Sequence, residues 1–358
     1  MAIFTNTITN TKNDIDLPVY EGYGLENCEY MNIFTEAFED DLDVIEAMHS
    51  YDMAEILGNR KIKSVIESKS ESDEDYNPEE DEEIGELKEE LQTTLEAEGE
   101  KAKGKFVEAV KKVWAKIKAF FQGVVRFFKN LGLSSKEFAA RNKKYMAQLD
   151  TNLKFTQRMY KWNHNTLLTD IPKSVTDVSK FITDLQKTLV SKLANNDLTK
   201  EQVEKVKDVM NNYSKSHSDI FRGSVVGKDK VSSEDFSAEF AAYCRGKEKV
   251  DISVTKDTVV NFMSILEQTD KKITDINNME KVIDNQYKTI IRETNALKFE
   301  YEVSGAKLGL IKKYNSIVNE HSQLTLSVIR KWSSAIQSCA NDYKAVISKA
   351  ITKSGVMK

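Results

Sequence analysis

The residues best suited to chemistry in this chain are lysines and arginines that alternate with aromatic side chains between positions 104 and 162. Cationic side chains bind phosphate groups, and aromatic rings stack on nucleic-acid bases. The cations that could contact nucleic acid or a membrane surface are Lys105, Lys111, Lys112, Lys116, Lys118, Arg126, Lys129, Arg141, Lys143 and Lys144. The rings farther along are Tyr145, Phe155, Tyr160 and Trp162. Because these rings also recur at helix-core spacing, attraction of phosphates is favoured over stacking.

No other pattern predicts catalysis, a metal site or a cofactor site. No ligand spacing such as HExxH relates the histidines, which are His49, His164, His217 and His321. Glycine-rich phosphate loops and a GxSxG elbow are missing from the sequence as well. The cysteines are far apart and lack CxxC spacing, which favours a reducing compartment: Cys28, Cys244 and Cys339. We therefore expect a protein that is not an enzyme and has no cofactor, metal or small-molecule substrate.

The two signs of charge are separated along the chain. Residues 1–100 contain 29 Asp and Glu against 6 Lys and Arg, a net charge of −23. The other 258 residues contain 28 acidic and 46 basic residues, a net charge of +18. An acidic segment of this kind could neutralise the basic part of the chain, within one molecule or between copies, and keep it away from nucleic acid.

Residues 104–131 lie just after the change of sign and are predicted to form an amphipathic helix. Its apolar face includes Phe106, Trp114, Phe120, Phe121, Phe127 and Phe128. Such a helix can pack into a bundle core or lie in a membrane interface with its lysines toward the headgroups. The chain has no run of 18 uncharged apolar residues, so no conventional membrane-spanning helix is expected.

The first 100 residues are predicted to be an acidic segment and a candidate propeptide. Helical periodicity covers residues 30–57 and should end at Gly58. Residues 67–82 are rich in like charge and poor in apolar residues, so they are predicted to be disordered, as in a flexible acidic linker.

The remainder of the chain is predicted to be helical, because it has few prolines and glycines and little strand-like alternation. A Ser134-x-x-Glu137 capping box should start a new helix after Gly132 that runs to about Trp162. The region 101–230 is then a basic amphipathic-helix region. Apolar stripes over 262–297 and 308–350 predict two long helices in 231–358 that fold back as an antiparallel coiled-coil hairpin or join a bundle. The predicted fold class is all-α: a helical bundle with this hairpin and a partly disordered acidic N-terminal segment.

Several sequence features together resemble the internal head, or internal virion, proteins of large tailed bacteriophages. Ile84-Gly85-Glu86 and Leu87-Lys88-Glu89 look like the hydrophobic-x-Glu cleavage motif of prohead proteases. An acidic leader precedes a basic body, in which KIKAFFQGVVRFFKNL is followed by KEFAARNKKYM and later by EFAAYCRGKEK. The resemblance implies processing at Glu86 or Glu89, a place inside the capsid after assembly in the host cytoplasm, and phage DNA or capsid proteins as partners.

Three hypotheses about function follow. In the first, the chain is a structural virion protein whose acidic leader masks a basic helical body that binds packaged DNA or the inner capsid shell without sequence specificity. In the second, it is a membrane-active protein that forms pores or binds the interface through residues 104–131. In the third, it is a coiled-coil interaction scaffold, and the C-terminal helices could also form an oligomer.

Overall fold

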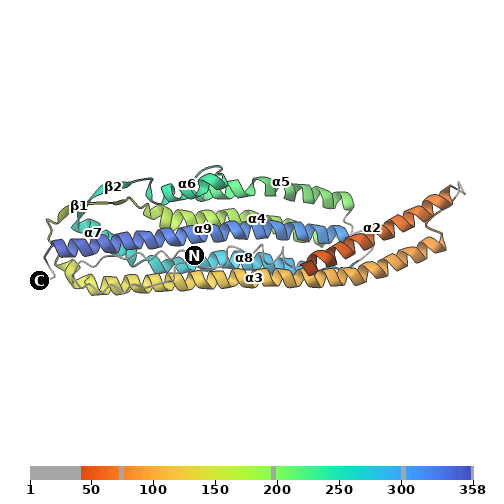
Figure 1. The fold of residues 1–358 in the computed structure, drawn as a ribbon, viewed down its shortest axis with the longest axis horizontal. Coiled ribbons are helices and arrows are strands. Elements are labelled where there is room, and N and C mark those ends of the chain that lie inside the picture. The colour runs from red at the N-terminus through yellow and green to blue at the C-terminus, as the bar shows by residue number, and fades with distance from the viewer. Residues whose placement is uncertain (1–41, 72–75, 195–198, 300–303, 356–358) are drawn as a thin grey trace, which may run out of the picture.

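The structure is a computed structural model that describes residues 42–71, 76–194, 199–299 and 304–355. Most of these residues are helical, which confirms the predicted fold class in its main feature (Figure 1). The long helices are α2 (Leu42–Ser70), α3 (Glu82–Ala147), α4 (Ile171–Leu193), α5 (Lys200–Val225), α6 (Ser233–Arg245), α7 (Lys256–Leu266), α8 (Lys272–Ala296) and α9 (Ser304–Lys353). Short helical turns cover Thr166–Asp170 and Thr269–Lys271, and two strands are β1 (Lys154–Tyr160) and β2 (Lys249–Thr255).

Helix α3 is one uninterrupted helix of 66 residues, about 100 Å long. It begins after Asp81, whose side chain accepts a hydrogen bond from the Glu83 amide, so the first turn is capped. The predicted break after Gly132 was wrong. Leu131, Ser135 and Ala139 are buried one turn apart, so the packed face of the helix continues across the glycine.

Helix α2 packs antiparallel on the first part of α3, and the two project from one end of the bundle as a hairpin (Figure 1). The predicted helix end at Gly58 was wrong, because α2 continues to Ser70. A Cβ at Gly58 would lie 2.2 Å from a Leu91 side-chain atom, so the glycine permits close approach of the two helices. Residues 67–70, predicted to be disordered, are helical, whereas 1–41 and 72–75 lie outside the described residues.

The strands form a two-stranded antiparallel sheet in which Phe155 pairs with Val254 and Tyr160 with Lys249. The prediction of a helix up to Trp162 was therefore wrong. Phe155 and Met159 are buried on one face of β1, which is the two-residue alternation of a half-buried strand.

The C-terminal helices α8 and α9 run antiparallel (Figure 1) and contact each other, while the predicted coiled-coil hairpin stays a prediction. The first apolar stripe is interrupted by the turn at Thr269–Lys271, so it spans α7 and α8 rather than one helix. In addition, α8 packs on α3 and α4, and α9 packs on α3, α4, α5 and α7. The pair is therefore part of a larger bundle, whose single core draws on all three predicted regions of the chain.

Candidate functional site

The apolar face of residues 104–131 fills the bundle core. The side chains of Phe106, Phe120, Phe121 and Phe128 are buried, and those of Trp114 and Phe127 are half-buried. The ring of Trp114 stacks on Tyr287 of α8 at 5.5 Å between centroids, and Phe128 lies 5.4 Å from Trp332 of α9. In this fold, membrane contact through that face would require α3 to separate from α8 and α9.

Among the described residues, no helix is both long and apolar enough to cross a bilayer.

The opposite face of α3 carries the predicted cations, and we refer to its exposed basic surface between Lys105 and Lys144 as the basic ridge. Residues 101–147 contain 13 Lys and Arg against two acidic residues, Glu108 and Glu137. Lys105 and Lys116 are half-buried, and the other eight predicted cations are exposed: Lys111, Lys112, Lys118, Arg126, Lys129, Arg141, Lys143 and Lys144. Because they share one straight helix, they extend over about 60 Å.

Some cations of the basic ridge have no acidic partner among the residues that the structure describes. Arg141 lies 3.7 Å from Glu137, an exposed pair of the kind that contributes little. Within the part of the chain that the structure describes, Lys111, Lys118 and Lys129 form no ion pair. The ridge can therefore attract an external polyanion.

The aromatic residues beyond the ridge are used inside the fold. Phe155 and Trp162 are buried, and the Trp162 indole N–H donates to Asp342 Oδ2 at 2.8 Å. The ring of Tyr160 is covered by the Arg245 guanidinium, 3.8 Å from its centroid. These contacts disfavour stacking of bases on these rings, in line with the preference for phosphate attraction.

The two predicted processing residues, Glu86 and Glu89, are exposed in the second and third turns of α3. The apolar residues of their motifs are less accessible, since Ile84 is fully buried and Leu87 is half-buried. A protease that reads both the apolar residue and the glutamate would therefore need this end of α3 to unwind.

The sequence did not reveal a buried histidine pair formed by α5 and α9. The His217 Nε2 atom lies 3.2 Å from His321 Nδ1, and His321 Nε2 lies 3.0 Å from Ser179 Oγ of α4. Burial lowers the pKa of His217 to about 4 and, with the neighbouring histidine, the pKa of His321 to about 3. Val203, Met210 and His217 are buried at seven-residue spacing, and this pattern could have placed His217 in the core.

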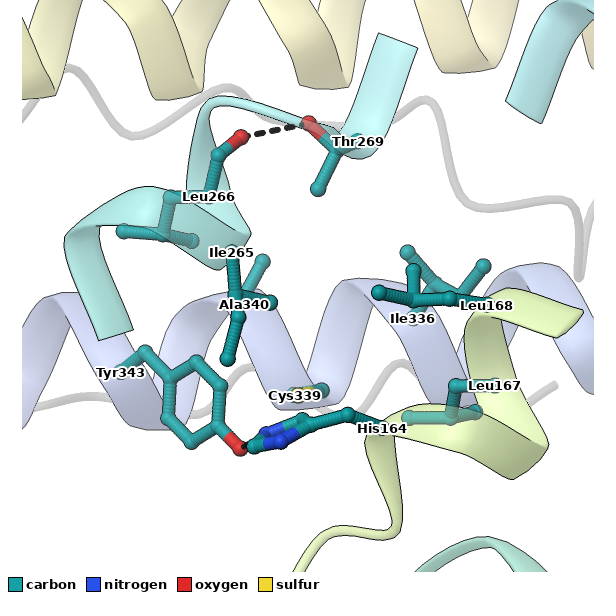
Figure 2. A pocket seen from close by; sticks show the side chains of 10 residues that line it. All are labelled: His164, Leu167, Leu168, Ile265, Leu266, Thr269, Ile336, Cys339, Ala340 and Tyr343. Carbon is teal, nitrogen blue, oxygen red and sulfur yellow. Dashed lines mark hydrogen bonds between the residues drawn. The ribbon is translucent and has the colours of Figure 1, made fainter. Parts of the chain in front are cut away.

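A small apolar cavity lies between α7, α9 and the start of the turn before α4 (Figure 2). Its volume of about 20 Å³ suits one water molecule. His164 Nε2 contacts the Tyr343 hydroxyl at its edge, and burial raises the pKa of the Cys339 thiol to about 12. A protonated thiol in a water-sized cavity is unsuited to nucleophilic chemistry. In the described ranges, no three His, Cys, Asp or Glu residues are arranged to hold a metal.

Comparisons with protein families, curated proteins and solved structures gave no match.

Proposed function

We propose that this chain is a non-enzymatic structural protein of a phage virion, located inside the capsid, whose basic ridge binds packaged DNA through its phosphates. The observation that carries the proposal is the row of exposed cations along one face of α3, including Lys111, Lys118 and Lys129 without ion pairs among the described residues. The resemblance to internal head proteins supplies the virion setting. The inner capsid shell would be attracted by the same charge if its surface is acidic.

Binding of this kind is expected to be independent of sequence. Lysines on a helix surface that is held in a bundle neutralise phosphates and release condensed counterions, whereas sequence is read by contacts with base edges in the grooves. A straight ridge of about 60 Å can lie along roughly 18 base pairs of duplex at 3.4 Å each and contact the phosphates that face it. Affinity should therefore depend strongly on salt and little on base composition.

Only part of the acidic leader could mask the basic ridge within one molecule. Residues 82–100 belong to the same rigid helix as the basic ridge, so they cannot fold back on it within one molecule. Masking within one chain is left to residues 1–41, which contain nine acidic residues and one lysine and lie outside the described residues. Processing at Glu86 or Glu89 would remove both α2 and this segment, and the intact mass of the protein in particles tests it.

The ridge is tested by fluorescence anisotropy with two unrelated 30-base-pair duplexes in 50 to 300 mM NaCl. We expect equal affinity for both and a linear fall of log K with log salt. The variant K111Q/K118Q/K129Q/K143Q should bind at least about tenfold more weakly at 50 mM NaCl. Its salt slope should be smaller by about 0.9 for each phosphate that the variant no longer neutralises.

A matched control removes the same amount of charge away from α3. K180Q/K187Q/K205Q/K207Q changes lysines of α4 and α5, of which Lys207 is half-buried and the others are exposed. All four already pair with carboxylates three or four residues away. This variant should keep wild-type affinity. Equal weakening by both variants, or no binding by the wild type at 50 mM NaCl, would rule out the ridge as the binding surface.

A further inference from the structure

The solvent-facing stripe of α3 changes sign once along its length. Every third or fourth residue from position 82 to position 143 is exposed, and these residues form one stripe on the helix. Its first part carries the exposed glutamates Glu82, Glu89, Glu100 and Glu108. Its second part carries the exposed lysines Lys111, Lys118, Lys129 and Lys136. The acidic and basic parts meet between positions 108 and 111.

Away from the junction at Glu108 and Lys111, the glutamates of the first part and the lysines of the second part are too far apart to pair within one chain. Glu89 and Lys129 are 40 residues apart on one continuous helix, which separates them by about 60 Å. Helix α3 lies along one side of the bundle (Figure 1), and its stripe is exposed from end to end. Glu100 has a local ion pair with Lys103 of the same helix, but it can meet the distant lysines of the second part only between molecules.

Three glutamate–lysine pairs on the stripe are antisymmetric about position 109, whereas Glu86 and Arg126 have no oppositely charged counterpart. Glu82 and Lys136 are each 27 residues from this position, Glu89 and Lys129 are each 20 residues away, and Glu100 and Lys118 are each nine residues away. In two antiparallel copies of α3 related by a two-fold axis at this position, each glutamate faces the lysine of its pair. Each glutamate–lysine pair therefore occurs twice, once on each side of the two-fold axis, as in other isologous interfaces.

We propose that the chain forms an antiparallel homodimer through the exposed stripe of α3, with Glu82, Glu89 and Glu100 of each copy facing Lys136, Lys129 and Lys118 of the other. Gly104 and Ala115 are exposed on the stripe on either side of the axis, and their small size lets the two helices approach. The apolar stripe of α9 is buried inside the bundle, so α3 offers the more available surface for a second copy.

The dimer should be weak and sensitive to salt. Exposed ion pairs contribute about 0 to 1 kcal/mol each, and a salt concentration of 0.5 M shortens the screening length to a few ångströms. The dimer would cover Lys118 and Lys129 of the basic ridge, so a second copy and a polyanion would compete for this part of α3. This inference stands on the charge order of α3 and does not require the proposed DNA binding.

Sedimentation velocity of the full chain tests the dimer. We expect dimers in 50 mM NaCl and monomers in 500 mM NaCl. The charge reversals K118E/K129E and E89K/E100K each place like charges opposite one another in the homodimer, so each variant should weaken dimerisation at least about tenfold. A mixture of the two variants restores opposite charges across the interface and should form a one-to-one heterodimer. One chain with all four reversals should form homodimers again.

The control K180E/K187E has the same change of net charge on α4 and should dimerise like the wild type. A monomeric wild type in 50 mM NaCl, a dimer that persists in 500 mM NaCl or in K118E/K129E, or a mixture without heterodimers would overturn the proposal. E89K/E100K separates it from DNA binding, because this variant keeps every lysine of the basic ridge and should lose only the dimer.

Discussion

The Nε2 atom of His217 lies 3.2 Å from Nδ1 of His321 in the bundle core. Hydrogen bonds continue from this pair to Ser179 and then to Val175. Their directions follow from the last bond, in which the Ser179 hydroxyl donates to the Val175 carbonyl oxygen at 2.8 Å. Ser179 Oγ then accepts from His321 Nε2–H, which leaves Nδ1 of His321 to accept from His217 Nε2–H. The His321 ring is therefore neutral, burial favours the neutral form of His217 by lowering its pKa, and the two rings join α4, α5 and α9.

Acid should destabilise the fold through this pair. The folded pKa values, about 4 for His217 and about 3 for His321, lie below the usual value near 6.5 of an unfolded histidine. The unfolded chain therefore binds more protons, and the stability that is present above pH 6.5 falls as the pH is lowered towards 4. At about 1.4 kcal/mol per histidine and pH unit, this pair should lower the free energy of unfolding by about 4 kcal/mol between pH 7 and pH 5. Burial also lowers the pKa of His164, so this residue adds to the drop.

Urea denaturation at the two pH values measures this drop, and the exposed His49 provides a control. H49Q should lose as much stability as the wild type. The carboxyl group of Asp81 does not contribute in this window, because its folded pKa of about 2 and its ordinary value of about 3.9 both lie below pH 5. Equal stability at pH 7 and pH 5 would contradict the burial of neutral histidines.

Helical periodicity that repeats over many turns was the most reliable structural signal in the sequence. The apolar arc of residues 104–131 predicted which side chains of α3 enter the core, because a helix that packs over many turns must repeat its apolar residues every three or four positions. The Thr199-x-x-Gln202 spacing is likewise visible in the sequence, and it forms the capping box at the start of α5. Both signals depend only on residues that are close in sequence.

The errors came from positions where a distant part of the chain decides the structure. Gly58 was interpreted as a helix end, but it lies against Leu91 of α3. β1 was interpreted as helix, because its partner β2 is about 95 residues further along the chain. The cations of the candidate site could be predicted as one face of a helix, whereas the contact of His217 with His321 could not, since it depends on how α5 packs on α9.

Truncation of the α3 core face should cost much of the total stability. Phe128 is fully buried beside Trp332, so F128A should lower the free energy of unfolding by about 3 to 5 kcal/mol. Leu133 is on the same helix but 59% exposed, and L133A should change it by less than about 0.5 kcal/mol. Chemical denaturation of both variants measures the difference, and equal effects would mean that this face of α3 is not packed.

The two glycines at the start of α3 should respond to alanine with opposite signs. A Cβ at Gly99 would lie 2.4 Å from the Phe299 ring, which is itself packed 5.5 Å from Tyr51. G99A should therefore destabilise the fold by about 1 to 3 kcal/mol. At Gly85 a Cβ would meet nothing within 4 Å, and G85A should stabilise the helix by about 0.8 to 1 kcal/mol. A gain of stability in G99A would contradict the close contact between α3 and Phe299.

The folded chain should not release dye from anionic lipid vesicles at pH 7. Membrane activity through residues 104–131 requires the rings of Phe106, Phe120 and Phe128 to enter lipid, and all three are buried in the bundle. A synthetic peptide of residues 104–131 has no bundle to cover these rings, so it should bind the same vesicles through its amphipathic face. The peptide thus shows that the assay can detect the exposed helix. If the full chain released dye as readily as the peptide, α3 would have to leave the core at neutral pH, and the membrane hypothesis would displace a structural role for the basic ridge.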